Sequence, residues 1–85
     1  MKILKFYAEW CGPCKQLSKN IDKFKELHPE VEIIPINADE EEELVDKYNV
    51  RNVPVLIKIV DDTEVARQSG LLTLPGLVKF ILEDE

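Results

Sequence analysis

Trp10-Cys11-Gly12-Pro13-Cys14 is the stretch that decides the fold of this chain. It contains the only two cysteines, and it directly follows the apolar run Lys2–Ala8. Apolar residues at helical spacing come after it, so the motif stands between an expected strand and an expected helix. A Cys-x-x-Cys at such a junction is typical of a redox dithiol. We therefore expect a strand-to-helix corner that carries a reactive pair of thiols.

The two cysteines are expected to differ in environment. Pro13 suits the first turn of a helix, where its missing N–H costs nothing, so Cys11 lies at or just before the helix N-terminus. Unpaired amides and the helix dipole there favour a thiolate and hold the pKa of Cys11 below that of a free thiol. Cys14 lies one turn further along. We expect Cys11 to be exposed and Cys14 to be buried beneath it, as exchange through a mixed disulfide requires.

Length, charge and cysteine usage narrow the class of protein. The 85 residues, 45% of them hydrophobic, fit one domain over residues 1–85. A formal charge of −6 makes nucleic acid and anionic membranes poor partners. No apolar run approaches the roughly 20 residues that span a bilayer, and strand-like sequence begins at Lys2 without a signal peptide. We therefore expect a cytoplasmic protein, and a monomer because no large exposed apolar stripe requires a dimer. In a compartment that keeps thiols reduced, a two-cysteine motif is catalytic more often than structural.

The cysteines could instead form a structural disulfide or bind zinc. A disulfide between Cys11 and Cys14 closes so few residues that it constrains the unfolded chain little, which disfavours a purely structural bond. Zinc needs four ligands, and His28 is the only further soft ligand, far along the expected helix. We therefore expect no metal.

The order of expected elements is β-α-β-α-β-β-α, an α/β fold with a four-stranded mixed sheet flanked by three helices. Pro35 cannot donate to a ladder, which places its strand at an edge or at a bulge. Asp39 is expected to cap the second helix, and Thr73 the third. The apolar stripe of the first helix is Cys14, Leu17, Ile21, Phe24 and Leu27. The strands are expected at Lys2–Ala8, Val31–Asn37, Val55–Val60 and Glu64–Ser69.

The motif, with Ala8-Glu9 before it and Lys15 after it, resembles the active site of the thioredoxin family. Asn37-Ala38-Asp39, Lys47–Pro54, Glu64-Val65-Ala66 and Gly70 follow in the family's order and spacing. The resemblance covers nearly the whole chain and implies a minimal thioredoxin-like fold. Thioredoxins usually carry a further strand and helix before the active-site strand, whereas this sequence begins at that strand. Its size is that of a glutaredoxin.

The resemblance also implies the site residues. Cys11 would be the attacking nucleophile and Cys14 the resolving cysteine. Val53-Pro54 matches the family's cis-proline, which faces the active-site disulfide, and the backbone of Val53 would pair with an extended substrate. Gly70 would let a partner backbone approach closely. The expected substrate-binding residues are Trp10, Gly12, Pro13, Val53, Pro54 and Gly70, whereas Tyr7 is expected to pack in the core.

Lys5 departs from the family pattern. Thioredoxins usually carry a buried aspartate at this position, with a lysine on the neighbouring strand where this chain has Pro35. The carboxylate relay to the second cysteine therefore does not carry over. Two hypotheses stay open: the Lys5 stem packs while its ammonium reaches water, or Lys5 lies below Cys14 and modulates its pKa.

The function implied by the resemblance is reduction of protein disulfides, with a role in electron transport and cell redox homeostasis. The Gly12-Pro13 spacer accompanies the reducing members of the family. No cofactor is expected to be bound, and electrons would come from NADPH through a thioredoxin reductase. Disulfide-containing proteins would be the acceptors, with ribonucleotide reductase, methionine sulfoxide reductases and peroxiredoxins as candidates.

Two alternative functions remain. A glutaredoxin-like, glutathione-dependent reductase fits the length, although Asn52-Val53-Pro54 and Gly70–Thr73 differ from the glutaredoxin pattern. A redox-independent binding subunit of a larger enzyme would use the groove around Trp10, Val53 and Gly70 for docking. The electron donor discriminates the first alternative, and the activity of a Cys11→Ser variant discriminates the second.

Overall fold

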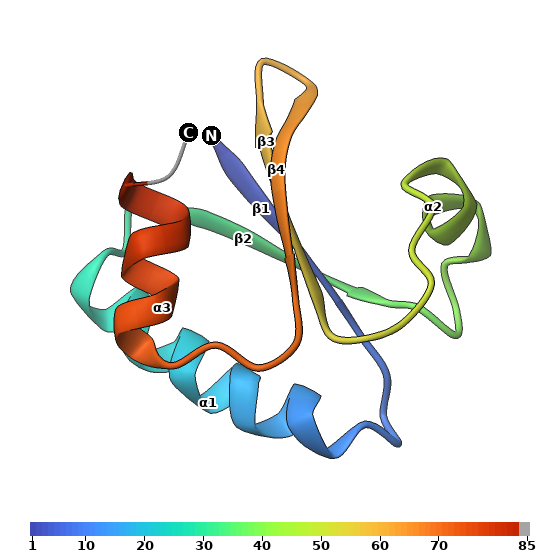
Figure 1. Cartoon of the computed structure of the whole chain (residues 1–85), viewed down its shortest axis with the longest axis horizontal. Helices are drawn as coiled ribbons and strands as arrows, with labels where there is room; N and C mark the ends of the chain where they lie inside the picture. Colours follow the sequence, from blue (N-terminus) through green and yellow to red (C-terminus); the bar gives the residue numbers. More distant parts are fainter. Residues whose placement is uncertain (84–85) are drawn as a thin grey trace.

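A computed structural model describes residues 1–83. The expected β-α-β-α-β-β-α order is confirmed (Figure 1), and the last helix, α3, continues into a π-helical turn, η1. The strands are β1 (Lys2–Tyr7), β2 (Glu32–Asn37), β3 (Val55–Val60) and β4 (Thr63–Ser69). The helical segments are α1 (Gly12–Leu27), α2 (Glu42–Lys47), α3 (Leu74–Val78) and η1 (Lys79–Glu83).

The sheet has the strand order β2-β1-β3-β4. β1 runs parallel to β2 and antiparallel to β3, so the apolar strands β1 and β3 lie in the middle, where both faces are covered. β2 lies at the edge, as Pro35 predicts, and Pro35 is exposed there. β3 and β4 are joined through Asp61 and Asp62, both with positive φ, as a tight two-residue hairpin requires.

The helices cover the two faces of the sheet unequally. α1 and α3 lie on one face and α2 on the other (Figure 1). Fully buried side chains such as Phe24 and Leu77 join α1 and α3 to the first face. The second face is covered by α2, which packs against Phe6 and its neighbours through Leu44, Val45 and the C-cap residue Tyr48. The motif at the end of β1 thus leads directly into the helix that covers the first face.

Two details of the predicted elements are wrong. Asp39 does not cap α2, because that helix begins at Glu42 and its N-cap, Glu41, makes no side-chain hydrogen bond. Asp39 instead accepts a hydrogen bond from Trp10. Leu27 is 63% exposed and not part of the buried stripe, because His28 packs on Phe24 in its place, with ring centroids 5.0 Å apart.

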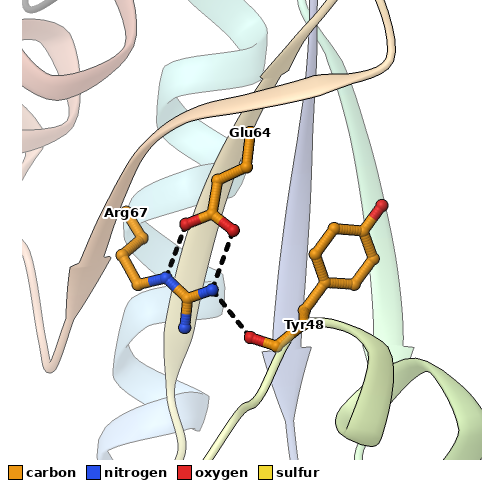
Figure 2. Close-up of polar contacts among 3 residues, drawn as sticks. All are labelled: Tyr48, Glu64 and Arg67. Atoms are coloured by element: carbon orange, nitrogen blue, oxygen red, sulfur yellow. Dashed lines mark hydrogen bonds and ion pairs between the residues drawn. The ribbon is translucent and has the colours of Figure 1, made fainter.

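An arginine ties β4 to the end of α2. Arg67 donates from Nε and Nη2 to the two carboxylate oxygens of Glu64, at 2.7 and 2.8 Å. Its Nη2 also donates to the backbone carbonyl of Tyr48 at 2.7 Å, and Figure 2 shows the three residues together. Asn49 follows with a φ of 53°, which confirms the expected left-handed residue after α2. This clamp therefore holds the start of the segment that leads to Val53-Pro54.

Candidate active site

The motif forms the expected corner between β1 and α1. Cys11 is the N-cap residue of α1, and Pro13 lies in the first turn, which confirms their predicted placement. The Cys11 Sγ accepts a hydrogen bond from the backbone N–H of Cys14 at 3.1 Å. The backbone N–H of Cys11 donates to the carbonyl of Ala8 at 3.2 Å, which closes the turn after β1. An amide at the start of α1 therefore points at the Cys11 sulfur, as stabilisation of a thiolate requires.

Cys11 and Cys14 form a disulfide, with their Cα atoms 5.2 Å apart. Cys11 is 4% exposed and Cys14 is 3% exposed. The expectation that Cys11 is exposed is therefore wrong for this disulfide form. The physical reason is local packing: both cysteines form a cluster with Ala8, and the side chains of Tyr7 and Val53 pack against it. The difference between the two sulfurs lies in their position at the helix N-terminus and not in their exposure.

The predicted second element of the site lies beside the disulfide. The Val53–Pro54 peptide bond is cis, and Val53 packs against the cysteine cluster. The backbone N–H of Gly70 donates to the carbonyl of Pro54 at 2.9 Å, so these two segments are neighbours. Gly70 has a φ of +89°, a conformation that side chains other than glycine rarely adopt. The structure thus brings Cys11, Val53, Pro54 and Gly70 into one region.

Trp10 forms the wall of a groove next to this region. Its side chain is 73% exposed, and its indole Nε1 donates to the Asp39 carboxylate at 2.9 Å. The groove has a volume of about 450 Å³. It is lined by Trp10, Ala38, Asp39, Val45, Val50, Arg51, Asn52 and Val53. The lining is mainly apolar, and its three polar residues are Asp39, Arg51 and Asn52.

The sequence prediction included only part of this groove. Trp10 and Val53 line it as expected, whereas Gly12 and Pro13 lie exposed in the first turn of α1, outside its lining. Asp39 and Arg51 were missed. An exposed tryptophan usually finds an acceptor for its N–H, and that signal could have directed attention to Asp39.

A second cavity, of about 310 Å³, reaches Cys14 from the side of α1. It is lined by Tyr7, Ala8, Glu9, Cys14, Lys15 and Ser18. Tyr7 is half-buried, so it is a wall of this cavity as well as a packing residue.

Lys5 is half-buried on the face of β1 that α1 covers. Its Nζ donates to the Ser18 Oγ at 2.8 Å and lies 5.3 Å from the centroid of the Tyr7 ring. Burial lowers the pKa of Lys5 from its ordinary value, and the carboxylate of Asp22 acts in the opposite direction. The bond to Ser18 was part of neither sequence hypothesis.

Among residues 1–83 no group of three or more His, Cys, Asp or Glu side chains could hold a metal ion. No helix in this described part of the chain has the length and hydropathy needed to cross a membrane.

A strand, a Cys-x-x-Cys disulfide at the cap of the following helix, and a cis-proline beside it define the class of redox-active thioredoxin folds. The family model described as Thioredoxin matches residues 1–83. The chain belongs to the thioredoxin family.

Relatives support this membership in sequence and in structure. Thioredoxin of Chlamydia pneumoniae is 41% identical over 79 residues, which cover 93% of this chain and 78% of the relative. The X-ray structure of Fasciola hepatica thioredoxin superposes with a TM-score of 0.88 at 32% identity, covering 98% of this chain and 79% of that one. The oxidised form of mitochondrial thioredoxin 3 from Saccharomyces cerevisiae superposes with a TM-score of 0.84 at 26% identity, covering 93% of this chain and 74% of that one.

Proposed function

We propose that this protein reduces protein disulfides by thiol–disulfide exchange through Cys11 and Cys14. The observation that carries the proposal is the disulfide at the N-terminal cap of α1, where the Cys14 amide donates to the Cys11 sulfur. A thiolate at Cys11 keeps this hydrogen bond and gains the favourable end of the helix dipole. Cys11 is therefore the nucleophile and Cys14 the resolving residue.

The reaction proceeds in two exchange steps. The Cys11 thiolate attacks one sulfur of the substrate disulfide, so a Cys11–substrate S–S bond forms and the substrate S–S bond breaks. The other substrate sulfur leaves as a thiolate and takes a proton from solvent. Cys14 then loses its proton and attacks the Cys11 sulfur, which releases the second substrate thiol. Two electrons pass to the substrate, and the Cys11–Cys14 disulfide is formed.

The surface around the disulfide would hold the substrate as an extended segment. The backbone of Val53, beside the cysteine cluster, is placed to pair with such a segment. Trp10 and the groove of about 450 Å³ would contact its apolar side chains. Gly12, Pro13, Pro54 and Gly70 lie outside the lining of this groove and would contact the segment beside it. Because Cys11 is buried in the disulfide form, the side chains packed against it, Tyr7 and Val53, would have to shift when the thiolate of a reductase attacks its sulfur.

We propose that NADPH is the electron source and that a thioredoxin reductase delivers the electrons. The electron acceptors would be disulfide-containing proteins such as ribonucleotide reductase. Reduction of protein disulfides requires a compartment that keeps thiols reduced, and we propose that this compartment is the cytoplasm. The protein would act as a monomer. These assignments rest on membership of the thioredoxin family and on the charge and size of the chain.

Insulin reduction tests the proposal. Both reactions contain NADPH; the first also contains a thioredoxin reductase, and the second contains glutathione and glutathione reductase. We expect turnover in the first reaction and its loss in Cys11→Ser. Turnover only with glutathione would favour the glutaredoxin-like alternative. Unchanged biological function of Cys11→Ser would favour the redox-independent binding role.

A further inference from the structure

Ser18 links the resolving cysteine to the lysine on β1. It follows Cys14 by four residues on α1, and side chains at this spacing are neighbours on one helix face. Its hydroxyl oxygen accepts a hydrogen bond from Lys5 Nζ at 2.8 Å. Ser18 and Cys14 also line the same cavity of about 310 Å³. Lys5, Ser18 and Cys14 therefore form a continuous set that runs from β1 across to α1.

The direction of the Lys5–Ser18 hydrogen bond decides what Ser18 can do next. An ammonium only donates, so the Ser18 oxygen must accept, and its single hydrogen points away from Lys5. Two acceptors lie one helical turn back: the backbone carbonyl of Cys14 and the Cys14 sulfur. A thiolate at Cys14 is the stronger acceptor of the two, because a hydrogen bond to a charged group is stronger than one to a neutral group.

We propose that Lys5 and Ser18 together stabilise the Cys14 thiolate, so that the resolving step uses a cation and a hydroxyl where the family resemblance leads one to expect a carboxylate. The proposal rests on the proposed reductase function. Lys5 acts through Ser18 and is a positioning residue. The Cys14 proton leaves to solvent through the cavity, the thiolate forms the bond to Cys11 Sγ, and the departing substrate thiolate takes a proton from solvent.

The charges around this set are few. Asp22 on α1 attracts Lys5 and favours its charged form, whereas burial lowers the pKa of Lys5. Glu9 and Lys15 line the cavity with opposite charges. The register partners of Lys5 on the neighbouring strands are Pro35 on β2 and Leu56 on β3, and neither is ionisable. α2 lies on the other face of the sheet. Lys5 is therefore the cation that α1 and the sheet hold nearest to Ser18.

A titration of Cys14 tests the proposal without any substrate. In a Cys11→Ser background Cys14 is the only thiol, and its thiolate is followed by ultraviolet absorbance. We expect Lys5→Met to raise the pKa of Cys14 by about one unit, the low end for a nearby charge because Lys5 is half-exposed. Ser18→Ala should raise it by less, and Lys5→Arg should keep it near the parent value.

The control is Lys25→Met. Lys25 is also partly buried on α1, and its Nζ bonds the Val31 carbonyl near the end of that helix. It lies eleven residues from Cys14, about 16 Å along the helix at 1.5 Å per residue. The substitution makes the same change in net charge, and we expect it to leave the Cys14 pKa unchanged.

The pH profile of the resolving step gives a readout that a packing defect would not reproduce. A thiol with a higher pKa is less ionised but intrinsically more nucleophilic. For a one-unit rise, Lys5→Met should release substrate from the mixed disulfide about threefold more slowly below the Cys14 pKa and about threefold faster above it. A merely structural loss would slow release at every pH.

An unchanged or lowered Cys14 pKa in Lys5→Met, or an equal rise in Lys25→Met or Lys5→Arg, overturns the proposal. If Lys5→Met does not fold, Ser18→Ala provides the same test, because alanine is the best helix former and this variant should fold. An unchanged Cys14 pKa in Ser18→Ala also overturns the proposal. Failure of insulin reduction in the parent protein would refute the reductase function and would leave the titration result standing.

Discussion

The Arg67 clamp predicts a measurable and pH-dependent share of stability. Arg67→Met removes the paired hydrogen bonds to Glu64 and the bond to the Tyr48 carbonyl. The side chains of Arg67 and Glu64 are 36% and 32% exposed, so their ion pair contributes only about 0.5 kcal/mol. The bond to the carbonyl adds about 1 kcal/mol. We therefore expect Arg67→Met to lower the free energy of unfolding by about 1.5 kcal/mol at neutral pH.

The pH dependence separates the two contributions. The hydrogen bonds from Arg67 hold the pKa of Glu64 below its ordinary value of 4.5. A carboxyl group with a lowered folded-state pKa stabilises the fold above its unfolded-state pKa, and this contribution is lost as the pH falls through the folded-state pKa. The Glu64–Arg67 coupling should therefore vanish in acid, whereas the bond to the Tyr48 carbonyl should remain.

Urea unfolding of the parent, Glu64→Gln, Arg67→Met and the double variant gives the coupling energy directly. We expect a coupling of about 0.2–1 kcal/mol at pH 7 that becomes undetectable below the Glu64 pKa. Glu26→Gln, which removes an exposed carboxylate on α1, is the control. A coupling that is absent at pH 7, or that is unchanged in acid, would refute this account of the clamp.

Two further predictions concern a helix cap and the groove wall. Thr73 Oγ1 accepts a hydrogen bond from the Gly76 amide at 3.2 Å. Thr73→Ala should therefore lower the free energy of unfolding in urea by about 1 kcal/mol, whereas Thr73→Ser should lower it little. Equal losses in the two variants would contradict the capping role. Asp39→Ala removes the carboxylate that accepts the hydrogen bond of the Trp10 indole. The fluorescence anisotropy of Trp10 should therefore fall, while the free energy of unfolding changes by less than about 1 kcal/mol. An unchanged anisotropy would show that Asp39 does not hold Trp10.

The fold could be predicted from sequence because its signals are local. Pro13 and the stripe from Cys14 to Phe24 define α1, and Pro35 restricts β2 to an edge or a bulge, of which the structure has the edge. Gly70 marks the end of β4 by its backbone freedom. In each case the signal lies within the segment itself, and no knowledge of the neighbouring segments is needed.

Three of the errors arose where one segment contacts another. Asp39 resembles a helix cap in sequence, but Trp10, 29 residues away, provides its hydrogen-bond donor. Cys11 was expected to be exposed because the helix N-terminus is exposed, whereas Val53 from a distant segment packs over the disulfide. The partner of Lys5 was missed for the same reason, since Ser18 approaches it only when α1 lies on the sheet.

Lys58 shows the same limitation in the core. The run Val55–Val60 predicts an interior strand, and Lys58 is indeed only 6% exposed. Its Nζ donates to the Phe80 carbonyl at 3.4 Å, in the π-helical turn that follows α3. A buried lysine needs such a partner, but the sequence does not say which distant carbonyl provides it.

The most direct test of the central claim is which cysteine forms the bond to substrate. Cys14→Ser and Cys11→Ser proteins are each reduced, mixed with a disulfide-bonded peptide, and analysed by intact mass and peptide mapping. We predict that Cys14→Ser accumulates a stable mixed disulfide at Cys11, because the resolving thiol is absent, and that Cys11→Ser forms little adduct. Rapid adduct formation at Cys14 in the Cys11→Ser protein, or none at Cys11 in the Cys14→Ser protein, would contradict the assignment of Cys11 as the nucleophile.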